Sequence, residues 1–216
     1  MRPGRFITLE GGEGAGKSTQ AVILAERLRG AGIDVVVTRE PGGTAGAEAI
    51  RALVVNGSAE RWDAVTEALL INAARADHVA RLIRPALAAG RWVISDRFVD
   101  STLAYQGAGK GADPALLRVL HGIASSDLWP DLTLILDLPV AEGLARAASR
   151  RSGEARFEGY APAFHERVRA AFAAAAQAEP GRCRIVDGRG STAEVADRLW
   201  QAAAPMSIGQ AGGAPC

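Results

Sequence analysis

The sequence predicts an α/β fold: a doubly wound, five-stranded parallel sheet flanked by helices. Five short runs rich in apolar and β-branched residues recur along the chain, and helix-length segments separate them. Most runs are apolar at successive positions, so both faces of the sheet need helices, joined by right-handed crossovers. The expected strands are Phe6–Leu9, Val35–Thr38, Trp92–Ser95, Thr133–Asp137 and Arg184–Val186.

The segments between these runs predict the helices. The expected helices are Lys17–Arg29, Ala45–Val54, Asp63–Ala89, Pro114–Ala124, Val140–Ser149, Pro162–Ala178 and Thr192–Ala203. Pro85 falls inside the third of them, and because proline lacks the backbone N–H, we expect a kink or a break there.

The 216 residues suit one domain, which we expect over residues 1–204. The stretch Ser149–Tyr160 is polar, rich in arginine and contains two glycines, a composition typical of a flap that closes over ligands. We therefore expect a lid at about 149–160. The small residues of 205–216 predict a disordered tail.

Charge and composition indicate the kind of partner. The formal net charge of +1 argues against a nucleic-acid partner bound by a general basic surface. The first residues contain no secretory apolar region, and no apolar run is long enough to span a membrane. Cys183 and Cys216 have no metal-binding spacing, which fits a reducing compartment. We expect a cytoplasmic protein with small-molecule partners, no nucleic acid and no membrane.

A phosphate-binding loop follows the first strand. Its sequence, from Gly11 to Ser18, fits the Walker A pattern G-x-x-x-x-G-K-[ST] between a strand and a helix. Glycines let successive N–H groups face one anion, and the helix adds the positive end of its dipole. Lys17 is expected to reach the β- and γ-phosphates. The expected ATP-binding residues are Gly11, Gly12, Glu13, Gly14, Ala15, Gly16, Lys17, Ser18 and Thr19.

Charged residues also follow the second and third strands, at the edge where open α/β sheets bind ligands. Asp96 ends an apolar run and is placed to bind Mg²⁺ opposite Ser18, and Arg97 can hold a phosphate bidentately. A surface salt bridge is the alternative for this pair. Glu13 repels a nucleotide in an anion-binding loop, so we expect it either to accept a hydrogen bond from a second substrate or to point into solvent.

The lid contains or adjoins four arginines: Arg146, Arg150, Arg151 and Arg156. Transfer of a γ-phosphoryl group spreads negative charge over its oxygens, and arginines brought in by lid closure can stabilise that charge. A solvated basic loop is the competing interpretation.

Taken together, these motifs resemble bacterial thymidylate kinases, which transfer phosphate from ATP to dTMP. The resemblance runs from Phe6 to about Leu199 and rests on Glu10–Ser18, Thr38–Thr44, Ala73–Arg75, Asp96–Arg97 and Ser101–Gly107. It implies a P-loop nucleoside monophosphate kinase fold, Mg²⁺ with ATP, and a homodimer whose interface includes the helix near Asp63–Ala89. It also implies a dTMP site made of Glu13, Glu40, Pro41, Ile71, Arg75, Arg97, Ser101, Thr102, Tyr105 and Gln106.

The resemblance also indicates a subtype. Some family members carry an arginine in the Walker A loop, where this chain has Gly14, and others supply it from the lid. This chain looks like the lid-arginine type, and we expect Arg150 or Arg151 to act with Lys17, Asp96 and Arg97 in catalysis, with Arg156 a weaker candidate. One position departs from the family: Ile71 stands where a phenylalanine commonly stacks on thymine, which weakens the expected grip on the base.

Two other functions remain open from the sequence. A kinase for another nucleoside monophosphate or a deoxynucleoside would use the same loop, and Ile71 is the residue that favours it. A GTP-dependent switch needs an Asn-Lys-x-Asp element, and none is present because Lys17 and Lys110 are the only lysines.

Overall fold

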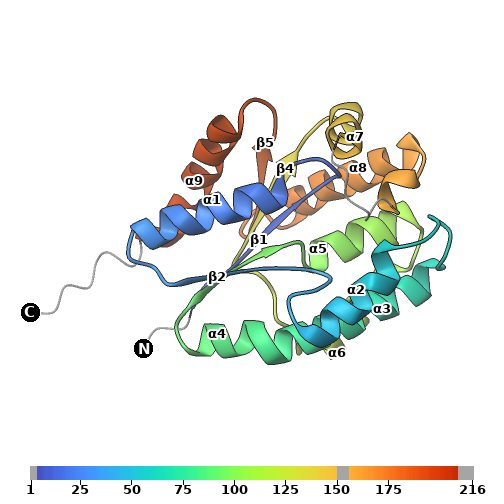
Figure 1. Cartoon of the computed structure of the whole chain (residues 1–216), viewed down its shortest axis with the longest axis horizontal. Helices are drawn as coiled ribbons and strands as arrows, with labels where there is room; N and C mark the ends of the chain where they lie inside the picture. The colour runs from blue at the N-terminus through green and yellow to red at the C-terminus, as the bar shows by residue number, and fades with distance from the viewer. Residues whose placement is uncertain (1–3, 150–155, 209–216) are drawn as a thin grey trace, which may run out of the picture.

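The computed structural model describes residues 4–149 and 156–208 of the chain, with 205–208 described by backbone alone. Its sheet has five parallel strands in the order β2-β3-β1-β4-β5, so the first strand lies at the centre (Figure 1). The fold class predicted from the sequence is confirmed. The strands are β1 (Phe6–Gly11), β2 (Val35–Arg39), β3 (Trp92–Asp96), β4 (Leu132–Asp137) and β5 (Cys183–Asp187).

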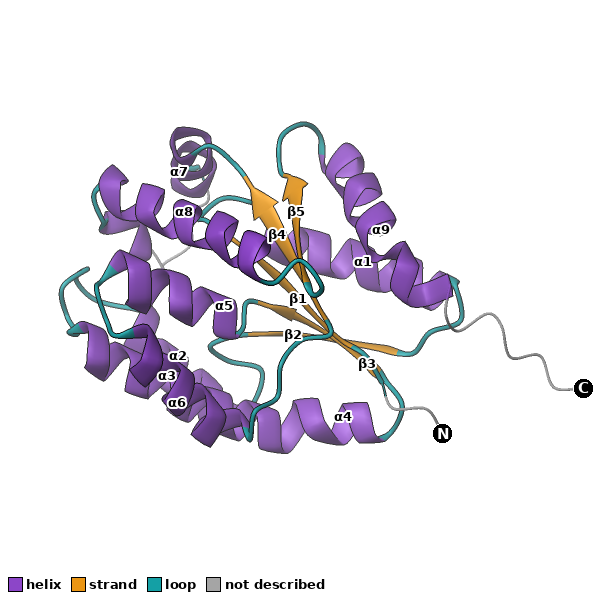
Figure 2. Ribbon diagram, turned by 180° about the vertical axis from the view of Figure 1, so that it is seen from behind, coloured by secondary structure: helices purple, strands orange, loops and turns teal. Residues whose placement is uncertain are grey.

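Helices cover both faces of this sheet. Figure 2 shows α1 and α9 on one side, and α4, α5 and α8 pack on the other, with α3 and α6 lying outside them. The described helices are α1 (Lys17–Gly30), α2 (Ala45–Val55), α3 (Ala64–His78), α4 (Arg84–Ala88), α5 (Val99–Thr102), α6 (Pro114–Ser125), α7 (Val140–Ala148), α8 (Pro162–Ala178) and α9 (Thr192–Ile208). Shorter turns are η1 (Val79–Ile83), η2 (Leu103–Gly109) and η3 (Phe157–Gly159).

The central strand β1 is buried along its whole length. Successive side chains of a strand point to opposite faces. Ile7 and Leu9 accordingly pack with the core beneath α1 and α9, whereas Phe6 packs with the α4 side. Thr8 and Glu10 share the face of Phe6, so this apolar strand carries two fully buried polar groups toward α5 and α8. This alternation later places Glu10 behind the functional site.

The long helix predicted over Asp63–Ala89 is interrupted ahead of Pro85, as expected. Asp63 caps its start by accepting hydrogen bonds from the N–H groups of Val65 and Thr66. The α-helical pattern ends at His78, a π-helical turn follows, and Pro85 lies in the first turn of α4. Proline is tolerated there because the first N–H groups of a helix have no intrahelical partner.

The segment after β3 forms a helix that we did not predict. α5 and the π-helical η2 run from Val99 to Gly109. The stretch contains serine, threonine and glycine, which are weak helix formers, so local propensity gave no signal. Packing supplies what propensity lacks, because η2 lies against α8 and most of its residues are buried.

The ends of the predicted lid and tail also need comment. The lid segment contributes the turn η3, whereas Arg150 and Arg151 lie outside the described residues. Helix α9 continues to Ile208, so the tail predicted from 205 onward is wrong over 205–208. The alanines that precede Pro205 are the strongest helix formers, and they favour continuation of the helix.

Candidate functional site

A cavity of about 320 Å³ lies beyond the carboxyl ends of β1, β2 and β3. It is the region where ligands bind in open α/β sheets. Most of the residues predicted for the site line this cavity together: Glu13, Gly14, Gly16, Lys17, Ser18, Glu40, Pro41, Ile71, Arg75, Asp96, Arg97, Ser101, Thr102, Tyr105 and Gln106. Gly11, Gly12, Ala15 and Thr19 are not part of its lining. Two expected groups, the phosphate loop and the second-substrate residues, therefore form the walls of one space.

The phosphate loop holds its lysine close to the backbone. Helix α1 begins at Lys17, as predicted, and the Lys17 ammonium donates to the carbonyls of Gly11 at 3.2 Å and Gly12 at 2.8 Å. Burial, together with the neighbouring Arg97 charge, lowers the pKa of Lys17 to about 8. An anionic ligand would stabilise the charged form, so the site is prepared for phosphate.

Gly14 marks a close approach between the loop and α7. Its φ is +70°, and a Cβ built there would lie 1.9 Å from the carbonyl oxygen of Gly143. Any side chain at this position would therefore displace the start of α7. An arginine in the loop, as in the other family subtype, does not fit this arrangement.

Ser18 and Asp96 face each other across the mouth of the loop. The Ser18 hydroxyl donates to Asp96 Oδ2, and Asp96 Oδ1 is buried without a hydrogen-bond partner among the described residues. A hydroxyl and a carboxylate are oxygen ligands that suit Mg²⁺, and the unpaired oxygen would gain a partner on binding it. Mg²⁺ keeps several waters, so two protein ligands are enough. The residues fit the ion predicted from the sequence.

Arg97 and Glu13 form the centre of the cavity. The Arg97 guanidinium donates to Glu13 Oε1 at 2.9 Å, and the Tyr105 hydroxyl donates to the same oxygen at 2.8 Å. Burial would raise the pKa of Glu13, but the charges of Arg97 and Lys17 outweigh it and lower the pKa to about 2. Glu13 is therefore ionised and turned into the cavity, which rules out the solvent-pointing alternative.

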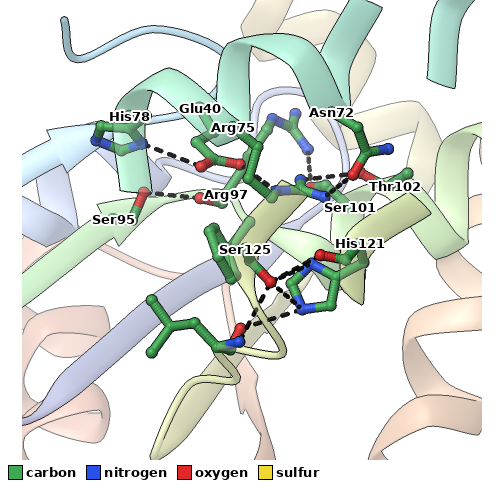
Figure 3. A network of polar contacts seen from close by, with 12 residues as sticks. Glu40, Asn72, Arg75, His78, Ser95, Arg97, Ser101, Thr102, His121 and Ser125 are labelled. Atoms are coloured by element: carbon green, nitrogen blue, oxygen red, sulfur yellow. Dashed lines mark hydrogen bonds and ion pairs between the residues drawn. The ribbon is translucent and has the colours of Figure 1, made fainter. Parts of the chain in front are cut away.

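A second buried group lies at the far wall, around Arg75 (Figure 3). Arg75 is 1% exposed and donates to Glu40 at 2.8 Å, to Asn72 at 3.3 Å and to Thr102 at 3.0 Å. His78 contacts the other oxygen of Glu40 at 3.0 Å. Although burial opposes it, the Arg75 charge keeps the pKa of Glu40 below its usual range. Arg75 thus enters the cavity with a fixed orientation.

The structure corrects the expectation for Arg156. Its side chain is fully buried and pairs with Glu67, which is buried as well. It also donates to the carbonyls of Ser58 at 2.8 Å, Val54 at 2.9 Å and Ala59 at 2.8 Å. A guanidinium held in this way joins the α2–α3 connection to α3 and does not face a transferred phosphoryl group.

Glu67 is also a neighbour of a predicted base contact. Gln106 donates its amide N–H to Glu67 at 2.7 Å, and Lys110 approaches the other oxygen at 3.2 Å. The amide nitrogen of Gln106 is thus used inside the protein. Its oxygen is the polar group left for a ligand in the cavity.

Sequence reasoning missed several residues of the site. Arg51, Val54, Val55 and Phe98 line the cavity, and Glu10 and His78 lie behind it. Burial and the nearby Asp100 charge raise the pKa of Glu10 to about 8. The signal that could have found Glu10 is a charged residue inside an otherwise apolar strand.

The fold and the site define a class: a P-loop nucleotide-binding α/β protein whose phosphate loop shares its cavity with a second group of charged side chains. The family model for thymidylate kinase matches residues 9–199. The chain therefore belongs to the thymidylate kinase family, which confirms the resemblance drawn from the sequence.

Individual relatives agree with this membership. The chain is 55% identical over 205 residues to a thymidylate kinase of Rhizorhabdus wittichii, covering 94% of this chain and 99% of that one. It is 58% identical over 187 residues to a thymidylate kinase of Caulobacter vibrioides, covering 87% and 89%. The crystal structure of the Ehrlichia chaffeensis thymidylate kinase superposes with a TM-score of 0.74 at 35% identity, covering 93% of this chain and 99% of that one. Over the described ranges, no helix is long and apolar enough to cross a membrane.

Proposed function

We propose that this chain transfers the γ-phosphoryl group of ATP to dTMP, giving dTDP and ADP. The observation that carries the proposal is the shared cavity, in which Lys17 and Ser18 face Glu13, Arg75 and Arg97. A nucleotide on the phosphate loop and an acceptor on the opposite wall would meet in this space. Membership of the thymidylate kinase family supports dTMP as the acceptor.

The proposed chemistry is an in-line displacement. An oxygen of the dTMP phosphate attacks the γ-phosphorus of ATP, the bond to the β,γ-bridging oxygen breaks, and ADP leaves with that oxygen. The attacking oxygen is already anionic, so no side chain has to remove a proton. Lys17 and Arg97 hold the two phosphates close together and stabilise the negative charge on them, so positioning and electrostatics provide the rate.

The acceptor would be held at three points. Arg97 binds its phosphate, while Ile71, Arg75 and Thr102, with Gln106, surround the base. Tyr105 and Glu13 lie at the sugar, where Glu13 accepts a hydrogen bond from the 3′-hydroxyl and the tyrosine ring leaves no room for a 2′-hydroxyl. Pro41 and Glu40 complete the wall near the phosphate. We further propose that Mg²⁺, held by Ser18 and Asp96, supplies charge neutralisation between the phosphates of ATP.

We retain Arg150 and Arg151 as the proposed source of positive charge on the transferred group. Both lie outside the described residues, and the argument for them remains the composition of the lid. The space at Gly14 supports it, because an arginine in the phosphate loop does not fit. Single alanine variants with full kcat would remove this part of the proposal. We place the reaction in the cytoplasm, where ATP is abundant.

The test is a coupled assay of ADP release with ATP and Mg²⁺ against dTMP, dUMP, dCMP, dGMP, AMP and thymidine. Strong turnover with dTMP, weaker turnover with dUMP and none with a Lys17→Ala variant is the expected result. Preferred turnover with another acceptor would favour the second candidate, a kinase for a different monophosphate or a deoxynucleoside. Ile71, which lines the cavity and is 8% exposed, is the observation that keeps this candidate open.

We also propose that the active form is a homodimer joined through α3 and α6. These helices pack together and expose four large apolar side chains: Val65 (43%), Leu69 (50%), Val119 (60%) and Ile123 (77%). Light scattering on a Leu69→Glu/Ile123→Glu variant should detect monomers. Val22→Glu, an equally apolar exposed site on α1, should leave the dimer intact.

A further inference from the structure

Arg97 has a backbone conformation that its type rarely adopts. Its φ is +71°, in the left-handed region that disfavours residues with a Cβ. Three hydrogen bonds hold the backbone there. The Arg97 N–H donates to Leu9 O at 3.0 Å, and Ser95 Oγ donates to the Arg97 carbonyl at 2.7 Å. The N–H of the next residue, Phe98, donates to Glu10 Oε1 at 2.7 Å.

The other end of Arg97 is held through the same carboxyl group. The guanidinium donates to Ser101 Oγ at 3.1 Å, and the Ser101 hydroxyl lies 2.5 Å from Glu10 Oε2. Figure 3 shows Ser95, Arg97 and Ser101 in this arrangement. One oxygen of Glu10 therefore fixes the peptide after Arg97, and the other fixes the hydroxyl on which the guanidinium rests.

We propose that Glu10 is a positioning residue for Arg97, acting from behind the site on both the backbone and the guanidinium. The inference rests on the proposed function, in which Arg97 binds the phosphate of the acceptor. Glu10 is fully buried and does not line the cavity, so it acts only through its neighbours. The arrangement holds in either protonation state, since one oxygen still accepts from Phe98 and a hydroxyl can both donate and accept.

This geometry predicts which substitutions are tolerated. In Glu10→Gln the amide oxygen can still accept from the Phe98 N–H, and the amide nitrogen can donate to Ser101 Oγ. In Glu10→Ala both contacts are lost, and a buried N–H is left without a partner. A role in packing alone would not separate these variants in one substrate and spare the other.

The experiment measures dTMP and ATP affinity separately by calorimetry, together with the melting temperature of each variant. Glu10→Ala should weaken dTMP binding by roughly tenfold to a hundredfold, the range expected for a misplaced charged contact, and change ATP binding by less than about threefold. Glu10→Gln should stay within about threefold for both. Thr8→Val is the matched control, because Thr8 is equally buried, lies on the same strand face and bonds to Thr133 at 3.0 Å. It should leave both affinities unchanged.

A double-mutant cycle separates this inference from the proposed function. In an Arg97→Ala background, Glu10→Ala should cause no further loss of dTMP affinity. Additive losses, or equal weakening of ATP and dTMP, would overturn the positioning role. If Arg97→Ala itself leaves dTMP binding unchanged, the proposed role of Arg97 fails instead. If Glu10→Ala does not fold, Ser95→Ala removes another support of the same peptide and should weaken dTMP binding, and unchanged binding would overturn the inference.

Discussion

Replacing Arg156 by alanine should destabilise the protein and spare the chemistry. The guanidinium and its partner Glu67 are both fully buried, and breaking a buried ion pair typically costs about 3–5 kcal/mol. Three backbone carbonyls also lose their donor. Lys110 and Gln106 still contact Glu67 in the variant, which keeps the penalty near the lower end, about 3 kcal/mol. For a chain of this length we expect a fall in Tm of roughly 6–12 °C.

The assay combines thermal and urea unfolding with kcat measured well below the transition. Arg189→Ala is the control, since its ion pair with Asp187 is 62% and 43% exposed and should contribute less than about 1 kcal/mol. We expect kcat of the Arg156 variant within about threefold of the wild type, whereas loss of an arginine that stabilises the transferred phosphoryl group costs about 10³-fold or more. An unchanged Tm together with such a loss of kcat would refute the structural role.

Three further outcomes follow from the site and its surroundings. Ile71→Phe should tighten dTMP binding by roughly fivefold in calorimetry, because an aromatic face adds about 1 kcal/mol on a base, and weaker binding would mean that the side chain has no room there. Because the pKa of Lys17 is lowered to about 8, kcat/KM for ATP should fall above pH 8 by up to tenfold per pH unit, and a flat profile to pH 9.5 would contradict this. Burial, together with the Arg75 charge, lowers the pKa of His121 to about 4. The unfolded chain therefore binds a proton below pH 6.5 that the native state refuses, so stability should drop by up to about 3 kcal/mol between pH 6.5 and 4. His121→Asn should flatten urea-unfolding curves over that range.

The sequence predicts the framework of the site because the framework depends on local signals. Apolar runs place the strands, parallel strands end at one edge, and Lys17 and Ser18 occur at fixed spacing behind glycines. What it cannot predict are contacts between distant residues. Arg156 looks like Arg150 and Arg151 in the sequence, and its partner Glu67 lies 89 positions away. The same limit explains why Glu10, whose contacts are about 90 positions away, had no predicted role.

These distant contacts decide what each arginine of the cavity can bind. Arg75 is 1% exposed, and its three nitrogens already donate to Glu40, Asn72 and Thr102. A carboxylate already neutralises its charge, so it suits the neutral carbonyl oxygens of a base better than a phosphate. Arg97 is more accessible, with 18% of its side chain exposed, and shares Glu13 with Tyr105. An incoming phosphate can therefore compete for Arg97. Two residues of the same type are thus prepared for opposite ends of one nucleotide, and exchange of phosphate for sulfonate in an acceptor analogue should reduce its affinity through Arg97 alone.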